Sequence, residues 1–179
     1  TDKIAQDVMK NVMKYAKILK KDPENYEARA EIMWCGSLSH NGLTGCGTCG
    51  GDWATHLMEH ELGGMFDVAH GAGLAAVWGS WARYVMDEKP ERFAQFAVDV
   101  MGVEESDDVK STALKGIEAV EEFYRMIEMP TNMKELGINP TDEQIKDMAM
   151  KATNHDTQQL GAFKKLSAKD LVEIYKTAK

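Results

Sequence analysis

The amino-acid sequence predicts an all-α fold in one domain. Apolar residues recur every three or four positions along nearly the whole chain, which is the period of an amphipathic helix. No alternating apolar–polar run of useful length predicts a strand, and no repeat of about 20–50 residues is present. The chain has 179 residues, 44% of them hydrophobic, which is enough to bury one core without disulfide or metal support.

Two helices are expected at the N-terminal end. An apolar stripe predicts the first over residues 3–20. Asp22 then suits a helix cap and Pro23 suits the first helical position, so a second helix is expected to run to about Leu43. Four residues are expected on its apolar side: Tyr26, Ala30, Met33 and Trp34.

A glycine-rich loop over residues 44–51 separates these helices from the next pair. Asp52 is expected to cap a short helix from Trp53 to about Met65. Residues 71–86 are apolar on nearly all sides, which predicts a helix at the centre of the core.

The second half of the chain continues as helices. Pro90 opens one helix, and an apolar stripe over residues 114–127 predicts the most clearly amphipathic helix of the chain. The acidic stretch 104–108 between them is expected to be a solvated loop and helix start.

Capping signals mark the last segments. Pro130 is expected to begin a short helical turn that Gly137 ends. Thr141 and Gln144 have the spacing of a capping box, and Ser167 is expected to cap the last helix.

Charge and composition exclude several classes of function. The chain has 21 Lys and Arg against 29 Asp and Glu, a net charge of −8, which argues against nucleic-acid and anionic-membrane partners. No uninterrupted apolar run is long enough for a membrane span. Three cysteines are an odd number for a disulfide framework, which favours a reducing cytoplasm over secretion. The first residue is Thr1 rather than Met, and further residues are expected upstream.

Two short motifs in the glycine-rich loop are only weak indications of function, because each lacks the context that its function requires. Residues 45–50 satisfy the glycine pattern of dinucleotide-binding folds, but a helix precedes them where that fold needs a strand, so a flexible turn is the simpler interpretation. Cys46 and Cys49 form a Cys-x-x-Cys pair without the second pair of a zinc knuckle or the βαβ setting of a redox motif. Cys35 is expected to be a core residue.

Three histidines within fifteen residues form the strongest chemical signal. His56, Glu59 and His60 match the H-x-x-E-H pattern of a class of zinc proteases, in which Glu59 would be the general base. Those proteases combine helices with sheets, and this sequence predicts no sheet. A zinc protease is therefore kept as an alternative hypothesis. A non-catalytic helical interaction domain is a further alternative, in which these histidines are core residues.

A different pairing joins His56 to His70. Gly63 and Gly64 are expected to weaken the helix after His56, and the chain from there to His70 is long enough to return to the level of His56. Two imidazoles from two elements form half of a site for a divalent ion, and at least one more ligand is needed. His40 and His155 are expected to be structural or surface residues.

The histidine segment resembles the metal-binding segment of the iron-containing alcohol dehydrogenases. Residues 52–63 and 69–74 carry the resemblance, which is greatest to the NAD(P)H-dependent butanol dehydrogenase branch. Residues 22–30, 129–137 and 163–166 are also similar to that family. One departure is the glycine-rich Cys-x-x-Cys before Asp52.

This resemblance implies the helical C-terminal domain of the iron-containing alcohol dehydrogenase and dehydroquinate synthase-like fold, over residues 1–179. It implies His56 and His70 as ligands of Fe²⁺ or Zn²⁺, together with an Asp-x-x-x-His pair expected upstream of Thr1. His60 matches a family histidine near the reacting centre and is expected to be a catalytic residue that relays a proton.

The resemblance also implies partners. An N-terminal nucleotide-binding α/β domain, absent from this chain, is expected to bind NAD(P)H, and the substrate is expected to be a small alcohol or aldehyde. The complete enzyme is expected to be a cytoplasmic homodimer with no nucleic-acid or membrane partner. As a fragment, the chain alone is expected to be inactive.

Overall fold

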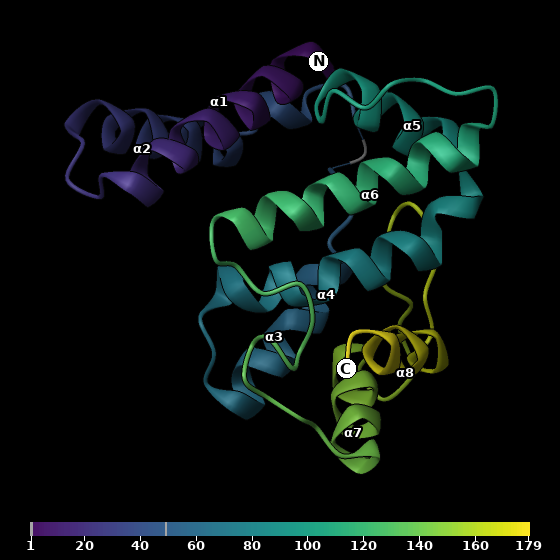
Figure 1. Cartoon of the computed structure of the whole chain (residues 1–179). Coiled ribbons are helices and arrows are strands. Elements are labelled where there is room, and N and C mark those ends of the chain that lie inside the picture. The colour runs from purple at the N-terminus through teal and green to yellow at the C-terminus, as the bar shows by residue number, and fades with distance from the viewer. Residues whose placement is uncertain (1, 49) are drawn as a thin grey trace.

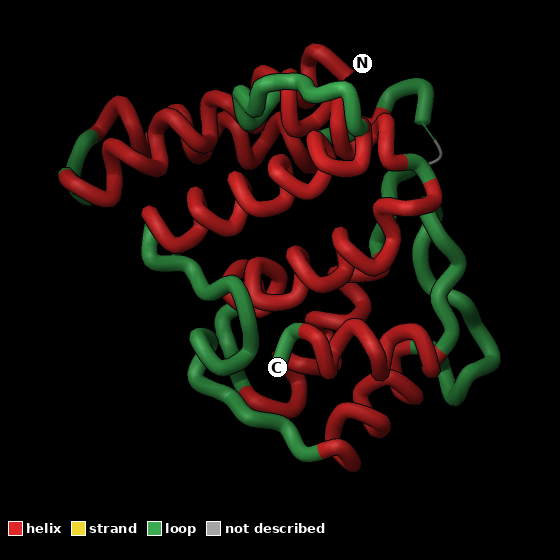
Figure 2. The backbone as a smooth tube through the Cα atoms, turned by 45° about the vertical axis from the view of Figure 1, so that its right-hand side comes forward, coloured by secondary structure: helices red, strands yellow, loops and turns green. Residues whose placement is uncertain are grey.

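The computed structural model describes residues 2–48 and 50–179, and over these residues it is helical and contains no strand (Figures 1 and 2). The α-helices are α1 (Asp2–Lys21), α2 (Tyr26–His40), α3 (Ala54–Phe66), α4 (His70–Val85), α5 (Pro90–Asp99), α6 (Val109–Met126), α7 (Asp142–Ala152) and α8 (Ala168–Thr177). Two short 3₁₀ turns are η1 (Leu43–Gly45) and η2 (Met86–Glu88). The prediction of an all-α fold is confirmed. None of the described helices is long and apolar enough to cross a membrane.

Helix α4 lies at the centre of the molecule, as its sequence predicted. It packs against α3 on one side, α6 on another and α8 on a third (Figure 1). Ala76, Val77 and Ala82 are fully buried along it, and Val77 and Ala82 belong to one hydrophobic core with residues of α3, α6, α7 and α8. A helix that contacts neighbours on three sides has little use for polar residues, which explains its composition.

Helices α5 and α6 pack closely because a glycine lies at their contact. A Cβ atom at Gly116 of α6 would overlap the side chain of Ala97 in α5. Ala97 itself is fully buried. The absent side chain therefore allows the two backbones to approach each other.

The prediction for α2 is wrong in two respects. Asn25 caps the helix by accepting a hydrogen bond of 3.0 Å from the Ala28 N–H, whereas Asp22 and Pro23 lie in the preceding turn. The residues expected to be buried are exposed: Tyr26 to 85%, Met33 to 75% and Trp34 to 61%, with Ala30 also exposed. Helix α2 packs chiefly against α1, so a single neighbour buries only the face that carries Ala28 and Cys35.

The capping predictions in the second half are confirmed. Pro90 occupies the first turn of α5, and the boxes of Thr141 with Gln144 and of Ser167 with Asp170 are both formed. The acidic stretch 104–108 is a loop that ends at the cap of α6. Residues 130–137 form turns without a helix.

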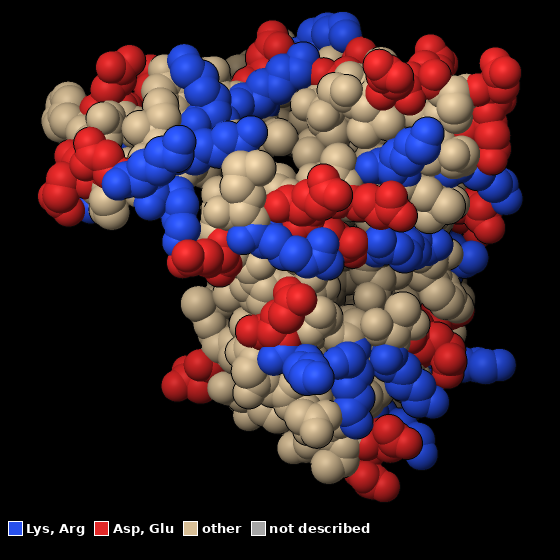
Figure 3. All heavy atoms as spheres, viewed as in Figure 1, with Lys and Arg blue, Asp and Glu red and all other residues tan. Residues whose placement is uncertain are grey.

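Charges of both signs cover the face shown in Figure 3. Lys and Arg side chains gather over α1, and acidic side chains gather over α6 beside them. Lys20 of α1 forms an ion pair with Glu128, just beyond the end of α6. The basic residues on this face therefore lie beside acidic ones.

Candidate functional site

Asp52 fixes the start of α3, the helix that carries two of the three histidines. Its Oδ1 accepts a hydrogen bond of 2.9 Å from the N–H of Ala54. Its Oδ2 accepts bonds of 2.8 Å from the N–H groups of Ala162 and Phe163. One carboxylate thus joins the first turn of α3 to the loop that precedes α8, and His56 lies in that first turn.

The turn between α3 and α4 brings the third histidine back. Helix α3 continues through Gly63 and Gly64 to Phe66, close to the predicted end near Met65. It ends at Asp67, which has a left-handed backbone with φ of 52°. Helix α4 begins three residues later with His70 as its first residue.

The three imidazole rings converge at this junction. The ring centroid of His70 lies 5.2 Å from that of His56 and 5.6 Å from that of His60, and His56 and His60 are 6.5 Å apart. His60 and His70 are exposed and His56 is half-buried, with the ring of Trp53 4.8 Å from that of His56. The structure therefore brings together all three histidines of the predicted site.

Glu59 is the residue whose place in this cluster the sequence did not reveal. Its side chain is only 2% exposed, and its Oε2 contacts Nδ1 of His70. Glu59, His60 and His70 each offer an atom that could bind a metal ion, and these atoms lie within 4.8 Å of one another. Spacing along α3 places residues 56, 59, 60 and 63 on one helix face, and this signal could have located Glu59 beside the histidines.

The local electrostatics favour a neutral His56. Burial lowers the pKa of its imidazole, and the neighbouring His70 and His60 lower it further, while Glu59 opposes them. A neutral imidazole is the form that binds metal ions. The donor set of imidazoles with an adjacent carboxylate fits a borderline divalent cation.

The geometry does not favour the protease alternative. A general base must reach a water molecule beside the substrate. The carboxylate of Glu59 is instead buried and engaged with His70. The described chain also lacks the mixed helix-and-sheet setting of those proteases.

The other sequence motifs lie outside the cluster. A helix and a 3₁₀ turn precede residues 45–50, so the strand required by a dinucleotide fingerprint is not found in the described chain. Cys49 lies outside the described residues, and the Cys-x-x-Cys hypothesis is therefore not tested. Cys35 is buried, as expected. His40 and His155 are exposed, at the end of α2 and after α7, and His40 contributes to the lowered pKa of His56.

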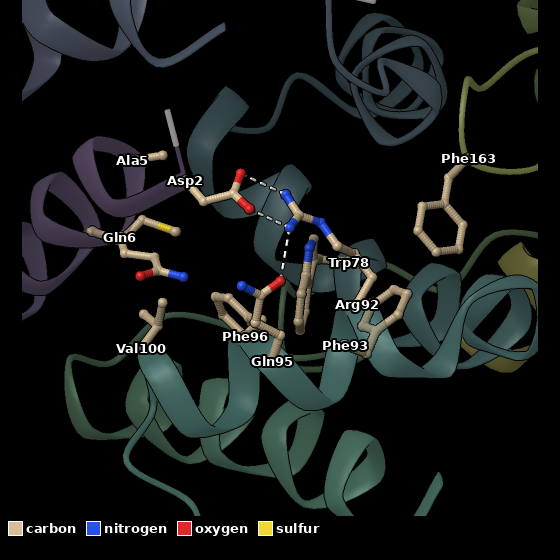
Figure 4. A pocket seen from close by; sticks show the side chains of 11 residues that line it. Asp2, Ala5, Gln6, Trp78, Arg92, Phe93, Gln95, Phe96, Val100 and Phe163 are labelled. Carbon is tan, nitrogen blue, oxygen red and sulfur yellow. Dashed lines mark hydrogen bonds and ion pairs between the residues drawn. The ribbon is translucent and has the colours of Figure 1, made fainter. Parts of the chain in front are cut away.

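A cavity of about 290 Å³ lies between α1, α4 and α5, and it is a separate feature (Figure 4). Four of its eleven lining residues are aromatic, and the ion pair between Asp2 and Arg92 lies in its wall. None of the three histidines lines it. The residues that do are Asp2, Ala5, Gln6, Met9, Trp78, Arg92, Phe93, Gln95, Phe96, Val100 and Phe163.

Comparison with known proteins identifies the family of this chain. Residues 1–179 match the C-terminal part of the Fe-containing alcohol dehydrogenase family. The chain is 32% identical to NADH-dependent butanol dehydrogenase A of Clostridium acetobutylicum, over 98% of this chain and 44% of that protein. It is 30% identical to an NADPH-dependent aldehyde reductase of Escherichia coli, over 99% of this chain and 45% of that protein.

Comparison with solved structures leads to the same family. The crystal structure of NADH-dependent butanol dehydrogenase A from Thermotoga maritima superimposes with a TM-score of 0.89 at 33% identity, covering 98% of this chain and 45% of that one. The chain thus spans somewhat less than half the length of the relatives that it matches.

Proposed function

Because the chain belongs to the iron-containing alcohol dehydrogenase family and matches its C-terminal domain, we propose that it is the metal-binding part of an NAD(P)H-dependent alcohol dehydrogenase or aldehyde reductase. The observation that carries this proposal is the convergence of His56, His60 and His70 from two helices. The relatives named above, a butanol dehydrogenase and an aldehyde reductase, support it.

In this proposal, residues 1–179 form the helical domain, and the complete protein also has an N-terminal nucleotide-binding α/β domain. The relatives are more than twice as long as this chain, which supports a second domain. That domain binds NAD(P)H, and the substrate is a small alcohol or aldehyde. The complete enzyme is proposed to be a cytoplasmic homodimer.

His56 and His70 are proposed as the metal ligands that this chain provides, with an Asp and a further His supplied from the rest of the protein. Imidazole donors suit both Fe²⁺ and Zn²⁺. The chemistry that a bound divalent ion supplies is Lewis acidity, which polarises a carbonyl or hydroxyl oxygen.

His60 is proposed as the catalytic residue that moves the proton. Its imidazole is exposed beside His70, so it can exchange a proton with both solvent and a substrate hydroxyl group. Aldehyde reduction needs a proton at the oxygen when hydride arrives at the carbon, and alcohol oxidation needs that proton removed. Histidine suits both directions because its usual pKa lies near neutrality.

A metal titration of the 179-residue chain tests this proposal. Two or three of the ligands in a complete site should bind Zn²⁺ with a dissociation constant in the micromolar range or weaker, on the order of −8 kcal/mol. His56→Ala and His70→Ala should each abolish this binding, whereas His155→Ala should leave it unchanged. Nanomolar binding that survives His70→Ala would contradict the proposal and support the His56 and His60 pair of the protease hypothesis.

A further inference from the structure

The side chain of Glu59 occupies a slot formed by two glycines. Gly63 follows Glu59 by one helical turn in α3, and a Cβ atom there would lie 3.0 Å from Oε1 of Glu59. Gly73 faces it from the first turn of α4, where a Cβ atom would lie 2.6 Å from Oε1 and 2.7 Å from Cγ. Any larger residue at position 73 would have to displace the glutamate, so the absence of a side chain there makes room for it.

Within this slot the carboxylate has one ionisable partner, the imidazole of His70. Glu59 contacts Nδ1 of His70, and no Lys or Arg in the described part of the chain forms an ion pair with it. Burying a carboxylate without a partner is costly, so the contact with Nδ1 of His70 is needed to stabilise its place in the fold.

This contact determines which nitrogen of His70 remains available. A neutral imidazole carries its hydrogen on one ring nitrogen and a lone pair on the other. When Nδ1–H donates to Glu59, the hydrogen is on Nδ1 and the lone pair is on Nε2. Histidines that bind metals commonly donate their other N–H to a carboxylate in this way, which fixes the tautomer and the ring orientation.

We propose that Glu59 is a positioning residue that holds the Nδ1–H tautomer of His70, and that Gly73 is glycine so that Glu59 can reach it. The proposal deepens the proposed function, because it rests on His70 as a metal ligand. Two other roles are compatible with the same position of Glu59: it could itself bind the metal ion, or it could act as a general base. The positioning role differs from both.

The tautomer of His70 provides a test that needs no metal. In the metal-free chain labelled with ¹⁵N-histidine, at about pH 8.5 and so above the usual imidazole pKa of about 6.5, we expect His70 to carry its hydrogen on Nδ1. The His70→Ala variant assigns the signal. Glu59→Ala should move the hydrogen largely to Nε2, while Glu59→Gln, whose amide oxygen still accepts a hydrogen bond, should largely retain it on Nδ1. Glu61→Ala, two residues away on the same helix, is the control and should change nothing.

The glycine provides a second, independent test. Gly73→Ala should lower the melting temperature and shift the His70 tautomer as Glu59→Ala does. Gly71→Ala in the same turn, where a Cβ atom would meet nothing within 4 Å, should do neither. In the Glu59→Ala background, Gly73→Ala should no longer lower the melting temperature, because the side chain that it displaces is gone.

Metal binding separates this proposal from the proposed function. If the chain binds Zn²⁺, Glu59→Ala should weaken binding by about 10–100-fold, the usual effect of losing such a partner.

Loss of binding in Glu59→Ala with the His70 tautomer unchanged would make Glu59 a ligand and overturn the proposal. A wild-type chain that binds no metal but shows the tautomer shift would contradict the proposed function alone. An unchanged tautomer in both Glu59→Ala and Gly73→Ala would overturn the positioning role alone.

Discussion

At the scale of single residues, the histidines of the cluster have different surroundings. His70 contacts a buried carboxylate, His56 is half-buried against Trp53, and His60 is exposed. A metal ligand gains from a fixed orientation, whereas a group that transfers protons must reach both substrate and solvent. These surroundings support the proposed division of roles between His70 and His60.

His60→Ala in the complete enzyme tests that division. We expect the variant to keep its metal and to lose roughly 10²–10⁴ in turnover, the usual value of acid–base assistance, with a changed pH profile. Metal analysis and steady-state kinetics measure the two effects, and His155→Ala, at an exposed position after α7, is the control. Because an atom of His60 lies within 4.8 Å of those of Glu59 and His70, loss of metal in the variant would instead identify His60 as a ligand.

At the scale of elements, helix α8 depends on one carboxylate. Asp170 Oδ2 accepts hydrogen bonds of 2.7 Å from the Ser167 N–H and 2.6 Å from its hydroxyl group, and Oδ1 accepts a bond of 2.5 Å from the hydroxyl of Tyr84 in α4. Burial raises the pKa of Asp170, but the bonds from Ser167 and Tyr84 outweigh this and leave it below its usual value. The same bond to Asp170, with burial, raises the pKa of Tyr84 to about 12. Asp170 thus completes the capping box of Ser167 at the start of α8 and attaches α8 to α4.

Asp170→Asn should therefore destabilise the protein in a pH-dependent way. Since the pKa of Asp170 is lower in the folded chain than the 3.8 of a free aspartate, its contribution is complete above about pH 4 and is lost as the pH falls through the folded value. Loss of a helix cap costs about 1 kcal/mol, so thermal unfolding at pH 7 should show that loss, and the difference from wild type should shrink below pH 4. Asp147→Asn, which removes an exposed pair with Lys151, should change stability by less than about 0.5 kcal/mol. A constant difference at all pH values would contradict this account.

Elements with local signals were the most predictable from sequence. The capping boxes at Thr141 and Ser167 and the proline start of α5 involve groups within a few residues of one another, so their geometry follows from the local sequence. Helix α2 was predicted with the wrong buried face, because periodicity identifies an apolar side but not the neighbour that covers it.

At the scale of the whole molecule, the apolar face of α2 has no described neighbour. Tyr26, Met33 and Trp34 are exposed along it, and Trp53 is 56% exposed at the start of α3. Met65, which the histidine segment also contains, is partly buried against the core. Large exposed apolar areas are uncommon on stable monomers and usually mark contact surfaces.

We expect the 179-residue chain to bind a hydrophobic dye or to self-associate through the apolar face of α2. Sedimentation velocity over a range of concentrations and dye fluorescence measure this, and Met33→Lys with Trp34→Lys should reduce both signals. Met150→Lys, a substitution of a partly exposed apolar residue on α7, is the control. A compact monomer without dye binding would show that this face is not a contact surface, and a monomer that oxidises alcohols would contradict the proposed need for a second domain.

The sequence by itself determined the helical class, the central place of α4, most helix ends and the family. Each of these depends on periodicity, on capping groups close in sequence or on a motif of adjacent residues, all of which can be read without knowing which elements meet. The proximity of His56 to His70 was also predictable in outline, because the chain between them is long enough to return.

Only the tertiary structure decided what depends on contact between α3 and α4. The burial of Glu59, its contact with Nδ1 of His70 and the slot left by Gly73 require two helices to pack at one particular register. In sequence, Glu59 suits a solvent-exposed helix position or a protease base equally well, since a carboxylate is normally solvated. The physical reason for the difference is that a buried charge needs a partner, and its partner here lies eleven residues away on another helix.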